Sequence, residues 1–376
     1  MLDIAEELHR WCLRAEPFAV ATVSQVGGST PRGPGAALAV DGAGTAVGSV
    51  SGGCVEAAVY DLCADVLADG RPLVRSFGFS TDDLFDIGLT CGGTVEVLIE
   101  RIVPADRPEI VAFLAAAARR ERVALVRPVA DPAAGPGRAL VVRPDHPDRG
   151  SLGAAELDRI AGDRARELLA AGTTGPLVPW PGHATRLLVE SSVPAPRLLL
   201  FGAVDVAAAL ARLGSVLGYR VTVCDARPVF ATPARFPAGV EVVVDWPHRY
   251  LATADVDART VICVLTHDPK FDVPLLERAL GLPVAYVGAM GSRRTHDDRL
   301  ARLRAVGLDE TRLARLRSPL GLDLGARSPE ETALSIAAEI VSDRHGRSGL
   351  PLTGTSGTIH PPDRVRPSAR PAPTRP

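Results

Sequence analysis

Two glycine-rich turns, each with one cysteine, are the stretches of this 376-residue chain best suited to ligand chemistry. Residues 51–56 read Ser-Gly-Gly-Cys-Val-Glu and residues 91–96 read Cys-Gly-Gly-Thr-Val-Glu, so Gly-Gly-x-Val-Glu occurs twice. A β-type run enters the first turn and a helix-compatible run leaves it, which places Cys54 at or just before a helix N-terminus. Unpaired N–H groups and the helix dipole favour a thiolate there. Cys54 is therefore a candidate reactive thiol or metal ligand.

Glycines make both turns open to a ligand. Gly52 and Gly53 remove side chains beside the Cys54 sulfur, which lets the backbone approach a bound molecule closely. If the two turns face one another, Cys54, Cys91, Gly92 and backbone amides line one pocket that suits an anionic ligand. The alternatives are that Cys54 is a small buried hydrophobe and that both turns are ordinary, with the glutamates that end the two motifs facing solvent.

Two other segments carry arginines suited to binding an anion. The loop at residues 27–35 is rich in glycine and proline and carries Arg32, so it either grips a phosphate or the edge of a pterin or is an ordinary turn. Ser292, Arg293 and Arg294 stand at the start of a predicted helix, where the arginine fork matches a phosphate group.

No familiar metal-binding spacing occurs, since there is neither C-x-x-C nor His-x-x-x-His. Asp82, Asp83 and Asp86 lie close together and are either metal ligands or general bases, or part of a solvated loop and helix cap. The six cysteines are scattered and predict no disulfide framework. Lys270 is the single lysine among 42 basic residues, and its Asp-Pro-Lys-Phe-Asp setting resembles neither a P-loop nor a Schiff-base site.

Composition indicates a cytoplasmic protein with two cores. The chain is 46% hydrophobic, yet no apolar run approaches the twenty residues of a membrane span, and its amphipathic start has no signal-peptide core. A formal net charge of −2 gives no reason to expect nucleic acid or a membrane surface as a partner. A length of 376 residues favours two domains.

The elements that must position these residues fall into an α/β organisation. Residues 1–194 are predicted to form an α+β domain, which ends before the linker Pro194-Ala-Pro196. Its predicted helices are residues 1–14, 55–67, 108–120 and 154–171. Its predicted strands are residues 18–23, 36–40, 45–50, 72–79, 95–102, 123–129, 139–142 and 186–190.

Residues 195–345 are predicted to form a Rossmann-like domain, which is a doubly wound parallel sheet. A strand, a glycine turn at Gly202, a helix and a second strand ending in Asp225 match the dinucleotide-binding layout. Further apolar strands are expected at residues 240–244, 260–265 and 284–287, with ligand-binding loops at their carboxyl ends near His267 and residues 288–294. His267 is equally well a surface histidine. Residues 346–376 are predicted to be a disordered tail.

The nucleotide turn of this second domain is altered. Val204 stands where the fingerprint has its second glycine, the one that lets the backbone approach a pyrophosphate. Asp205 adds a negative charge where a phosphate belongs. NAD(P) binding is therefore doubtful.

Ordered motifs in both halves carry a family resemblance. In the first half these are Ala-Thr-Val-Ser-Gln-Val-Gly-Gly-Ser-Thr-Pro-Arg-Gly-Pro-Gly-Ala at residues 21–36, Gly-Ser-Val-Ser-Gly-Gly-Cys-Val-Glu at 48–56 and Cys-Gly-Gly-Thr-Val-Glu at 91–96. In the second half they are Leu-Leu-Leu-Phe-Gly-Ala-Val at 198–204, Thr-His-Asp at 266–268, Gly-Ala-Met-Gly-Ser-Arg-Arg at 288–294 and Ser-Pro-Leu-Gly-Leu-Asp-Leu-Gly-Ala at 318–326. Over most of residues 15–345 the chain resembles the XdhC/CoxI family.

The resemblance implies a function as an accessory factor of xanthine dehydrogenase and related molybdenum hydroxylases. The factor binds the molybdenum cofactor, supports its sulfuration by a cysteine desulfurase and delivers it to an apo-dehydrogenase. Cys54 then ligates molybdenum or relays sulfur, with Cys91 and Arg32 nearby and Arg293 and Arg294 binding the pterin phosphate. A carrier of this kind is not an enzyme in itself, and a homodimer is compatible with it. The family usually has Gly-Ala-Gly-His at residues 202–205, so Val204 and Asp205 are departures.

Two other classes of function remain open at the level of sequence. One is an NAD(P)-dependent oxidoreductase on the Rossmann-like domain, although no hydride-transfer constellation is recognisable. The other is a non-catalytic paralogue that keeps the fold and binds a partner protein.

Overall fold

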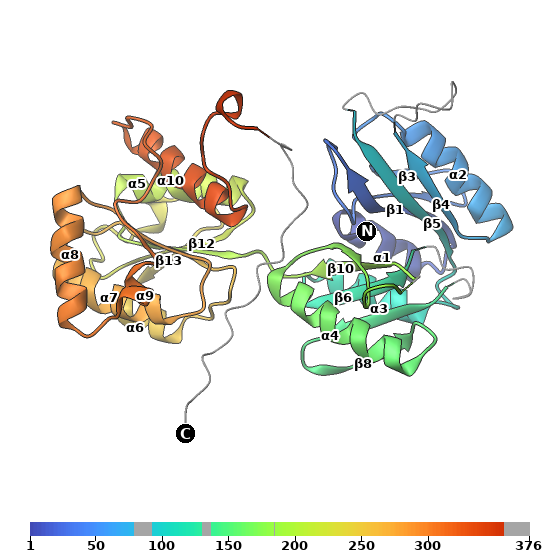
Figure 1. Ribbon diagram of the computed structural model, residues 1–376, viewed down its shortest axis with the longest axis horizontal. Helices are drawn as coiled ribbons and strands as arrows, with labels where there is room; N and C mark the ends of the chain where they lie inside the picture. Colours follow the sequence, from blue (N-terminus) through green and yellow to red (C-terminus); the bar gives the residue numbers. More distant parts are fainter. Residues whose placement is uncertain (79–91, 130–136, 184, 357–376) are drawn as a thin grey trace. The chain divides into compact units, whose positions relative to one another are not determined.

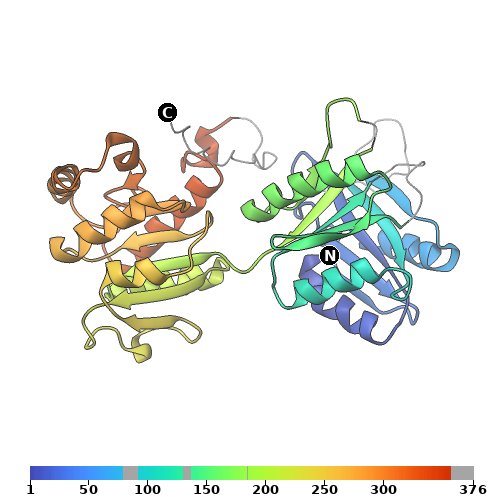
Figure 2. The same cartoon turned by 90° about the horizontal axis from the view of Figure 1, so that it is seen from below.

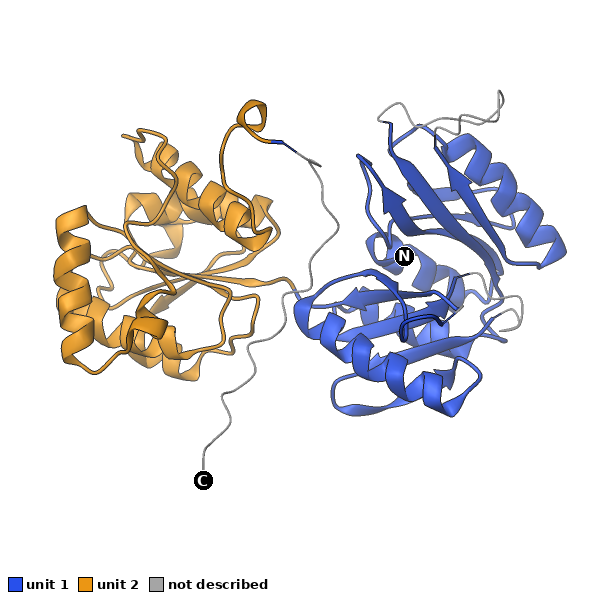
Figure 3. Ribbon diagram, viewed as in Figure 1, with its two compact units in different colours: residues 1–194, 356–376 blue, residues 195–355 orange. Residues whose placement is uncertain are grey.

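The structure is a computed structural model that describes residues 1–78, 92–129, 137–183 and 185–356. The chain divides into two compact units, shown in Figure 3. Unit 1 comprises residues 1–194 with residues 356–376, and unit 2 comprises residues 195–355. Cys91 and the aspartates at positions 82, 83 and 86 lie outside the described residues.

The first sheet of unit 1 has five antiparallel strands in the order β3-β2-β1-β5-β4 (Figure 1). The strands are β1 (Phe18–Gly27), β2 (Ala37–Asp41), β3 (Ala46–Gly48), β4 (Leu73–Phe77) and β5 (Thr94–Ile102). The first seven residues of the central strand β1 are all buried, so this strand packs on both faces. Helix α2 (Glu56–Asp69) covers one face, where it meets Ala19, Ala21 and Val97.

The second sheet of unit 1 also has five strands, in the order β8-β7-β6-β10-β9. They are β6 (Val123–Pro128), β7 (Ala139–Arg143), β8 (His146–Ser151), β9 (Gly175–Leu177) and β10 (Leu187–Ser192). Side chains alternate between the two faces of this sheet, as in any strand. Val123 and Leu125 join the core of α1 (Ala5–Leu13) and α3 (Pro108–Ala118), whereas Ala124 and Val126 face α4 (Ala155–Ala171).

Helices α1 and α3 form the layer between the two sheets. Their apolar core includes Trp11 and Phe113, and it takes Phe18 from the first sheet and Leu125 from the second. The short 3-10 helix η1 (Leu2–Ile4) leads into α1. Unit 1 is therefore layered in the order α2, first sheet, α1 with α3, second sheet, α4.

A buried charge network joins the two sheets around Arg127 of β6. The Arg127 guanidinium donates to Glu100 of β5, to Glu190 of β10 at 2.6 Å and to the Thr22 hydroxyl of β1 at 3.1 Å. The amino group of Met1 pairs with the other oxygen of Glu190. Burial opposes the charge of Arg127, but Glu190 and Glu100 outweigh it and raise the pKa of the guanidinium.

Unit 2 is built on one parallel sheet of six strands, in the order β13-β12-β11-β14-β15-β16. The strands are β11 (Arg197–Phe201), β12 (Arg220–Asp225), β13 (Glu241–Val244), β14 (Val261–Val264), β15 (Tyr286–Ala289) and β16 (Leu316–Arg317). In chain order the arrangement reads 3-2-1-4-5-6, which is the doubly wound order of the dinucleotide-binding fold. The chain reverses direction across the sheet between β11 and β14, and this is the topological switch point.

Helices cover both faces of that sheet, as Figures 1 and 2 show. On one face α5 (Asp205–Val216) and α10 (Pro329–Arg344) pack against Leu198 and Leu200. The other face buries Leu199 and Phe201 against α6 (Pro247–Thr253), α7 (Pro269–Gly281), α8 (Arg293–Ala305) and α9 (Glu310–Leu313). Among the described helices, none is long and apolar enough to cross a membrane.

The predicted fold class is confirmed, because unit 1 mixes antiparallel sheets with helices and unit 2 is the predicted parallel sheet. Predicted ranges differ from the observed ones mainly at their ends. The predicted strand at residues 45–50 ends at Gly48, and the predicted helix at residues 1–14 is split into η1 and α1. The short strands β8, β9 and β16 were not predicted.

Candidate functional site

The loops that carry the sequence motifs of unit 1 meet at one edge of the first sheet. Gly27, the last residue of β1, pairs with Thr94, the first residue of β5. Gly48, the last residue of β3, pairs with Leu38 near the start of β2. The loops after β1, after β3 and before β5 therefore leave the sheet on the same side.

Backbone contacts show that these loops touch. A Cβ atom on Gly93 would lie 2.2 Å from the Ser29 carbonyl oxygen, and one on Gly28 would lie 3.3 Å from the Gly93 Cα atom. A Cβ atom on Gly52 would lie 4.0 Å from the Pro31 side chain. The loop at residues 28–31 thus lies directly against Gly93 of the second turn, and its Pro31 side chain lies near Gly52 of the first turn.

Glu56 organises the first turn from inside. One carboxylate oxygen accepts hydrogen bonds from the Ser49 hydroxyl (2.6 Å) and the Ser51 and Gly52 amides (2.8 and 3.0 Å). The other oxygen accepts from the Ser51 hydroxyl (2.6 Å) and the Gly53 amide (2.8 Å). Burial alone would raise the pKa of Glu56, but these hydrogen bonds lower it from 4.5 to about 2.

This geometry changes the interpretation of the turn. The amides of Gly52 and Gly53, which the sequence suggested for an anionic ligand, already bind the Glu56 carboxylate as their anion. The alternative that both motif glutamates face solvent is wrong as well. Glu96 accepts from the Ser24 hydroxyl at 2.7 Å and forms a two-pronged pair with Arg186, with both N–O distances at 2.9 Å.

Cys54 sits at the rim of the turn, directly before Val55, the N-cap of α2. Its amide donates to the Ser51 hydroxyl at 3.0 Å, and its side chain is half-buried against the core beneath α2. The other described cysteines are buried, at positions 12, 63, 224 and 263. Burial raises the pKa of Cys12 to about 11 and that of Cys63 to about 12, so these thiols stay protonated at neutral pH.

Gly53, the neighbour of Cys54, and Gly92 of the second turn leave open space beside the backbone. Gly53 and Gly92 have φ angles of +124° and +72°, and a Cβ atom on either would meet no described atom within 4 Å. Both conformations favour glycine, and both positions are open. Among the described residues, which do not include Cys91, no group of three or more His, Cys, Asp or Glu side chains could hold a metal ion.

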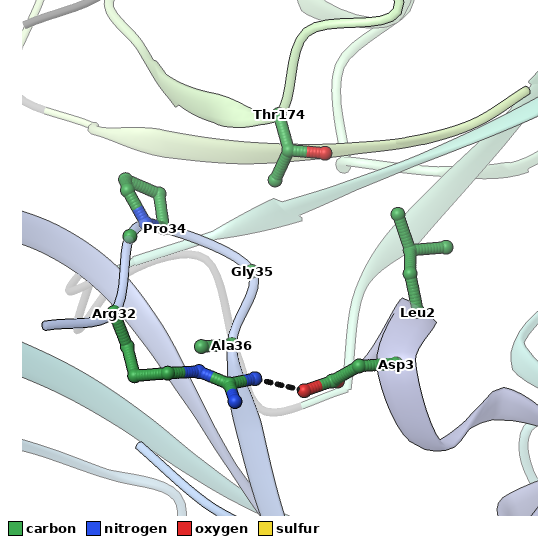
Figure 4. Close-up of a pocket in the computed structure, with 8 residues that line it drawn as sticks. Leu2, Asp3, Arg32, Pro34, Gly35, Ala36 and Thr174 are labelled. Atoms are coloured by element: carbon green, nitrogen blue, oxygen red, sulfur yellow. Dashed lines mark hydrogen bonds and ion pairs between the residues drawn. The ribbon is translucent and has the colours of Figure 1, made fainter. Parts of the chain in front are cut away.

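Arg32 points away from this rim toward the start of the chain. Figure 4 shows its guanidinium paired with Asp3 of η1. Both residues line a cavity of about 260 Å³. Gly35, Ala36 and Thr174 also line that cavity, whereas Gly52 and Cys54 do not. Arg32 therefore lines a cavity that does not include Cys54, although the loops that carry the two residues are neighbours.

Unit 2 has a larger cavity, of about 500 Å³, at the switch point of its sheet. Its lining comes from the turn after β11, from the loop after β12 and from the segment that joins β14 to α7: Val204, Arg227, Leu265, Thr266, His267, Asp268, Pro269, Lys270 and Phe271. The prediction that a ligand-binding loop lies near His267 agrees with the position of this cavity.

The nucleotide-binding groups of the fold are engaged elsewhere. Asp225, at the end of β12, accepts from the Ala203 amide at 2.8 Å and from two nitrogens of the Arg227 guanidinium at 2.9 and 2.8 Å. Burial would raise the pKa of Asp225, but these hydrogen bonds lower it. Asp205 pairs with Arg235 at 2.9 Å. Asp225 is thus not available to bind the hydroxyls of a ribose.

The predicted anion site at the start of α8 is exposed. The Ser292 hydroxyl accepts from the Thr295 amide at 3.1 Å and so serves as the helix cap. Arg293 and Arg294 are exposed, and neither lines either cavity. These residues belong to unit 2, whereas Cys54 belongs to unit 1.

Sequence reasoning missed Glu56, Arg227 and Lys270 as site residues. The signal for Glu56 was present, because a glutamate follows both glycine-rich turns at the same spacing. Arg227 lies two residues beyond the acidic end of β12, and nothing in a single sequence shows that it folds back onto Asp225.

Fold and site together define a protein with a thiol-bearing α+β unit and a Rossmann unit whose dinucleotide turn is altered. A family model for the XdhC and CoxI family matches residues 11–78, and a model for the XdhC Rossmann domain matches residues 198–340. The chain belongs to the XdhC/CoxI family.

Known relatives cover most of the chain. A probable xanthine dehydrogenase subunit from Bacillus subtilis is 27% identical over 88% of this chain and 94% of its own length. The molybdenum cofactor insertion chaperone PaoD from Escherichia coli is 28% identical over 86% of this chain and 83% of its own length. A crystal structure described as a xanthine dehydrogenase from Bacillus halodurans shares the fold, with a TM-score of 0.66 over 92% of this chain and 96% of that chain, at 24% identity.

Proposed function

We propose that this protein is an accessory factor that binds the molybdenum cofactor as cargo, supports its sulfuration and delivers it to a xanthine dehydrogenase-type enzyme. Membership of the XdhC/CoxI family and the similarity to a molybdenum cofactor insertion chaperone support this role. A cysteine desulfurase as the sulfur donor and the apo-dehydrogenase as the recipient are the partners that the proposal implies.

The observation that carries the proposal is the position of Cys54. It is the half-buried thiol among the described cysteines, at an edge where Gly53 and Gly92 leave the backbone open. A thiolate is a soft ligand that suits molybdenum or a transferable sulfur. The Glu56 hydrogen bonds hold the turn in one shape, so that the thiol does not have to be ordered when the cargo binds.

The test is retention of the cofactor by the full chain. Cys54→Ser and Cys54→Ala should lose most of the bound molybdenum, by about tenfold or more, measured by metal analysis and pterin fluorescence on the purified protein. Cys12→Ala is the matched control, because Cys12 is a buried thiol of the same unit with a raised pKa, and it should retain the cofactor. Equal molybdenum content in the Cys54 variants and in wild type, with unchanged circular dichroism, would refute the role of Cys54.

The oxidoreductase alternative has lost support. Val204 occupies the position of the second fingerprint glycine and lines the cavity. Both carboxylate oxygens of Asp225 accept hydrogen bonds from Arg227 or the Ala203 amide. Neither feature accommodates a dinucleotide in the usual way.

A further inference from the structure

The cavity of unit 2 lies where ligands bind in doubly wound sheets, outside the carboxyl ends of β11, β12 and β14 at the switch point. Gly202 makes the close approach of these strands possible, because a Cβ atom there would lie 2.9 Å from the Thr266 side chain and its φ angle is +113°. The volume of about 500 Å³ falls within the usual range for small-molecule sites.

Two cations stand at the walls of this cavity, and both keep donors toward solvent. Lys270 pairs with Asp268 at 3.0 Å, and its side chain is 60% exposed. Arg227 pairs with Asp225, and its side chain is 43% exposed. Asp225 is buried, and its negative charge is balanced by Arg227 and by the hydrogen bond from the Ala203 amide. The carboxylate that lines the cavity is that of Asp268.

The remaining wall is apolar. Val204, Leu265 and Phe271 line the cavity, but Leu265 is fully buried in the core, so Val204 and Phe271 are the apolar side chains that a ligand can touch. Small-molecule sites usually combine an apolar lining with a few convergent polar groups, so this cavity suits a ring system that bears an anionic group.

A dinucleotide does not fit this pattern. Its pyrophosphate would have to pass Val204, and its ribose would need Asp225 to accept hydrogen bonds. A ligand with one terminal phosphate needs neither group, because a phosphate monoester carries a charge of about −1.5 to −2 at pH 7 and can pair with exposed cations.

We propose that the cavity of unit 2 binds a phosphate monoester of a planar heterocycle, with Lys270 and Arg227 as the cations that hold the phosphate and Val204 and Phe271 against the ring. The site is distinct from the Cys54 turn; a nucleotide as its ligand goes beyond the proposed function, whereas a pterin phosphate rests on that function. Two sources share this chemistry, a nucleoside monophosphate and the phosphate of a pterin.

The first experiment is calorimetric titration of the full chain at low salt with four compounds: AMP, adenosine, neopterin monophosphate and NAD. We expect at least one phosphate monoester to bind, and AMP to bind about tenfold or more tightly than adenosine if the nucleotide is the source. Preference for the pterin monoester would assign the site to the cargo of the proposed function. Binding of neither monoester, or tighter binding of NAD than of both monoesters, would overturn the proposal, whereas equal affinity for AMP and adenosine would exclude the nucleotide as the source.

Charge variants of α7 test the assignment to Lys270. Lys270→Gln should weaken binding of the monoester about tenfold, and Lys270→Arg should keep most of the affinity. Arg278→Gln is the matched control, because Arg278 is an exposed cation of the same helix that does not line the cavity. Asp268→Asn keeps an acceptor for the Lys270 amide while it removes the negative charge, so binding should tighten. Equal affinities for Lys270→Gln and Arg278→Gln would contradict the assignment.

Because the chain has a single lysine, an NMR signal from that side chain reports directly on ligand binding at Lys270. Reductive methylation with ¹³C-formaldehyde gives one dimethyl-lysine resonance, from Lys270. That resonance should shift during titration with the monoester and stay constant with adenosine. The outcome is independent of the Cys54 test, because loss of molybdenum retention in Cys54 variants and loss of monoester binding in Lys270 variants are measured on different units. A constant resonance at saturating monoester would overturn the role of Lys270.

Discussion

Glu56 shows how one residue sets the geometry of the Cys54 turn. Its carboxylate gathers the hydroxyls of Ser49 and Ser51 and several amides of the same loop, so the turn is folded around an anion of its own. Hydrogen bonds to a charged acceptor are about twice as strong as neutral ones, and they fix the direction of the amides that they use. The thiol of Cys54 is therefore presented by a preformed loop.

We expect Glu56→Gln to loosen this loop. A glutamine offers one acceptor oxygen in place of two and turns an NH₂ group toward amide donors, so the local opening free energy should fall by about 1–3 kcal/mol. Hydrogen exchange of residues 50–55, read by mass spectrometry, measures the change. Asp61→Asn on the exposed face of the same helix is the control and should leave the exchange unchanged. Equal protection in both variants would show that Glu56 does not hold the turn.

The same interaction predicts a pH dependence. The pKa of Glu56 is lowered in the folded protein, from 4.5 to about 2, so its contribution to stability is complete above about pH 4.5. The contribution is lost as the pH falls from about 4.5 toward 2, because the folded loop must then be protonated. Protection of residues 50–55 should fall over this window in wild type, and the difference from Glu56→Gln should vanish near pH 2.

At the residue scale, sequence predicted the cysteine and the glycines but not the partner that organises them. The spacing Gly-Gly-x-Val-Glu was visible twice, and Glu56 and Glu96 were assigned to solvent in one reading because a single sequence does not show which way a side chain turns. The structure gives the two glutamates different partners, loop amides for Glu56 and Arg186 for Glu96. The roles of Cys54, Gly52 and Gly92 in binding remain predictions.

At the scale of elements, the site edge of the first sheet depends on close backbone contact between loops. A Cβ atom on Gly93 would lie 2.2 Å from the Ser29 carbonyl oxygen and 2.7 Å from the Thr30 side chain. The first of these contacts is to backbone, which cannot move without shifting the whole loop after β1. The two loops are therefore coupled.

Gly93→Ala should separate these loops and destabilise unit 1 by about 1–3 kcal/mol, the usual cost of overpacking. Gly33→Ala is the matched control, because a Cβ atom there meets nothing within 4 Å and the φ angle of Gly33 is not positive. Urea unfolding followed by circular dichroism compares the two variants. If Gly93→Ala and Gly33→Ala unfold at the same urea concentration, the contact does not constrain the edge.

The elements that were predicted well from the sequence are those whose own residues show a hydrophobic pattern, without reference to a neighbouring strand. The buried strands β11, β12 and β14 are mainly apolar, and β12 and β14 are also rich in β-branched residues, so they were found at nearly their observed ranges. Strand β8 reads His-Pro-Asp-Arg-Gly-Ser and lies at the edge of its sheet, mostly exposed, so neither hydrophobicity nor alternation marks it. Pairing with β7 creates that strand, and pairing is not visible in a local pattern.

At the scale of the whole molecule, each hydrophobic cluster of the described residues takes its members from one unit. The clusters around Trp11 and beneath α2 belong to unit 1, and those on the two faces of the parallel sheet belong to unit 2. Within unit 1, Arg127 joins the two sheets through buried ion pairs, so those sheets form one body. A core that is complete within one segment is the physical basis of an independent domain.

We expect the chain to fold as two independent pieces when it is divided between Pro194 and Ala195. Residues 1–194 and 195–376, produced separately, should each give a cooperative calorimetric transition, because no hydrophobic cluster of the described residues spans the cut. A phosphate monoester that binds the cavity of unit 2 should stabilise only the second piece. At a concentration of 100 times Kd the gain is about 2.7 kcal/mol, which raises Tm by roughly 5–10 °C for a piece of this size. If either piece is unfolded in isolation, the units depend on one another for stability. If the monoester raises the Tm of residues 1–194, the monoester site lies in unit 1, which contradicts the proposal.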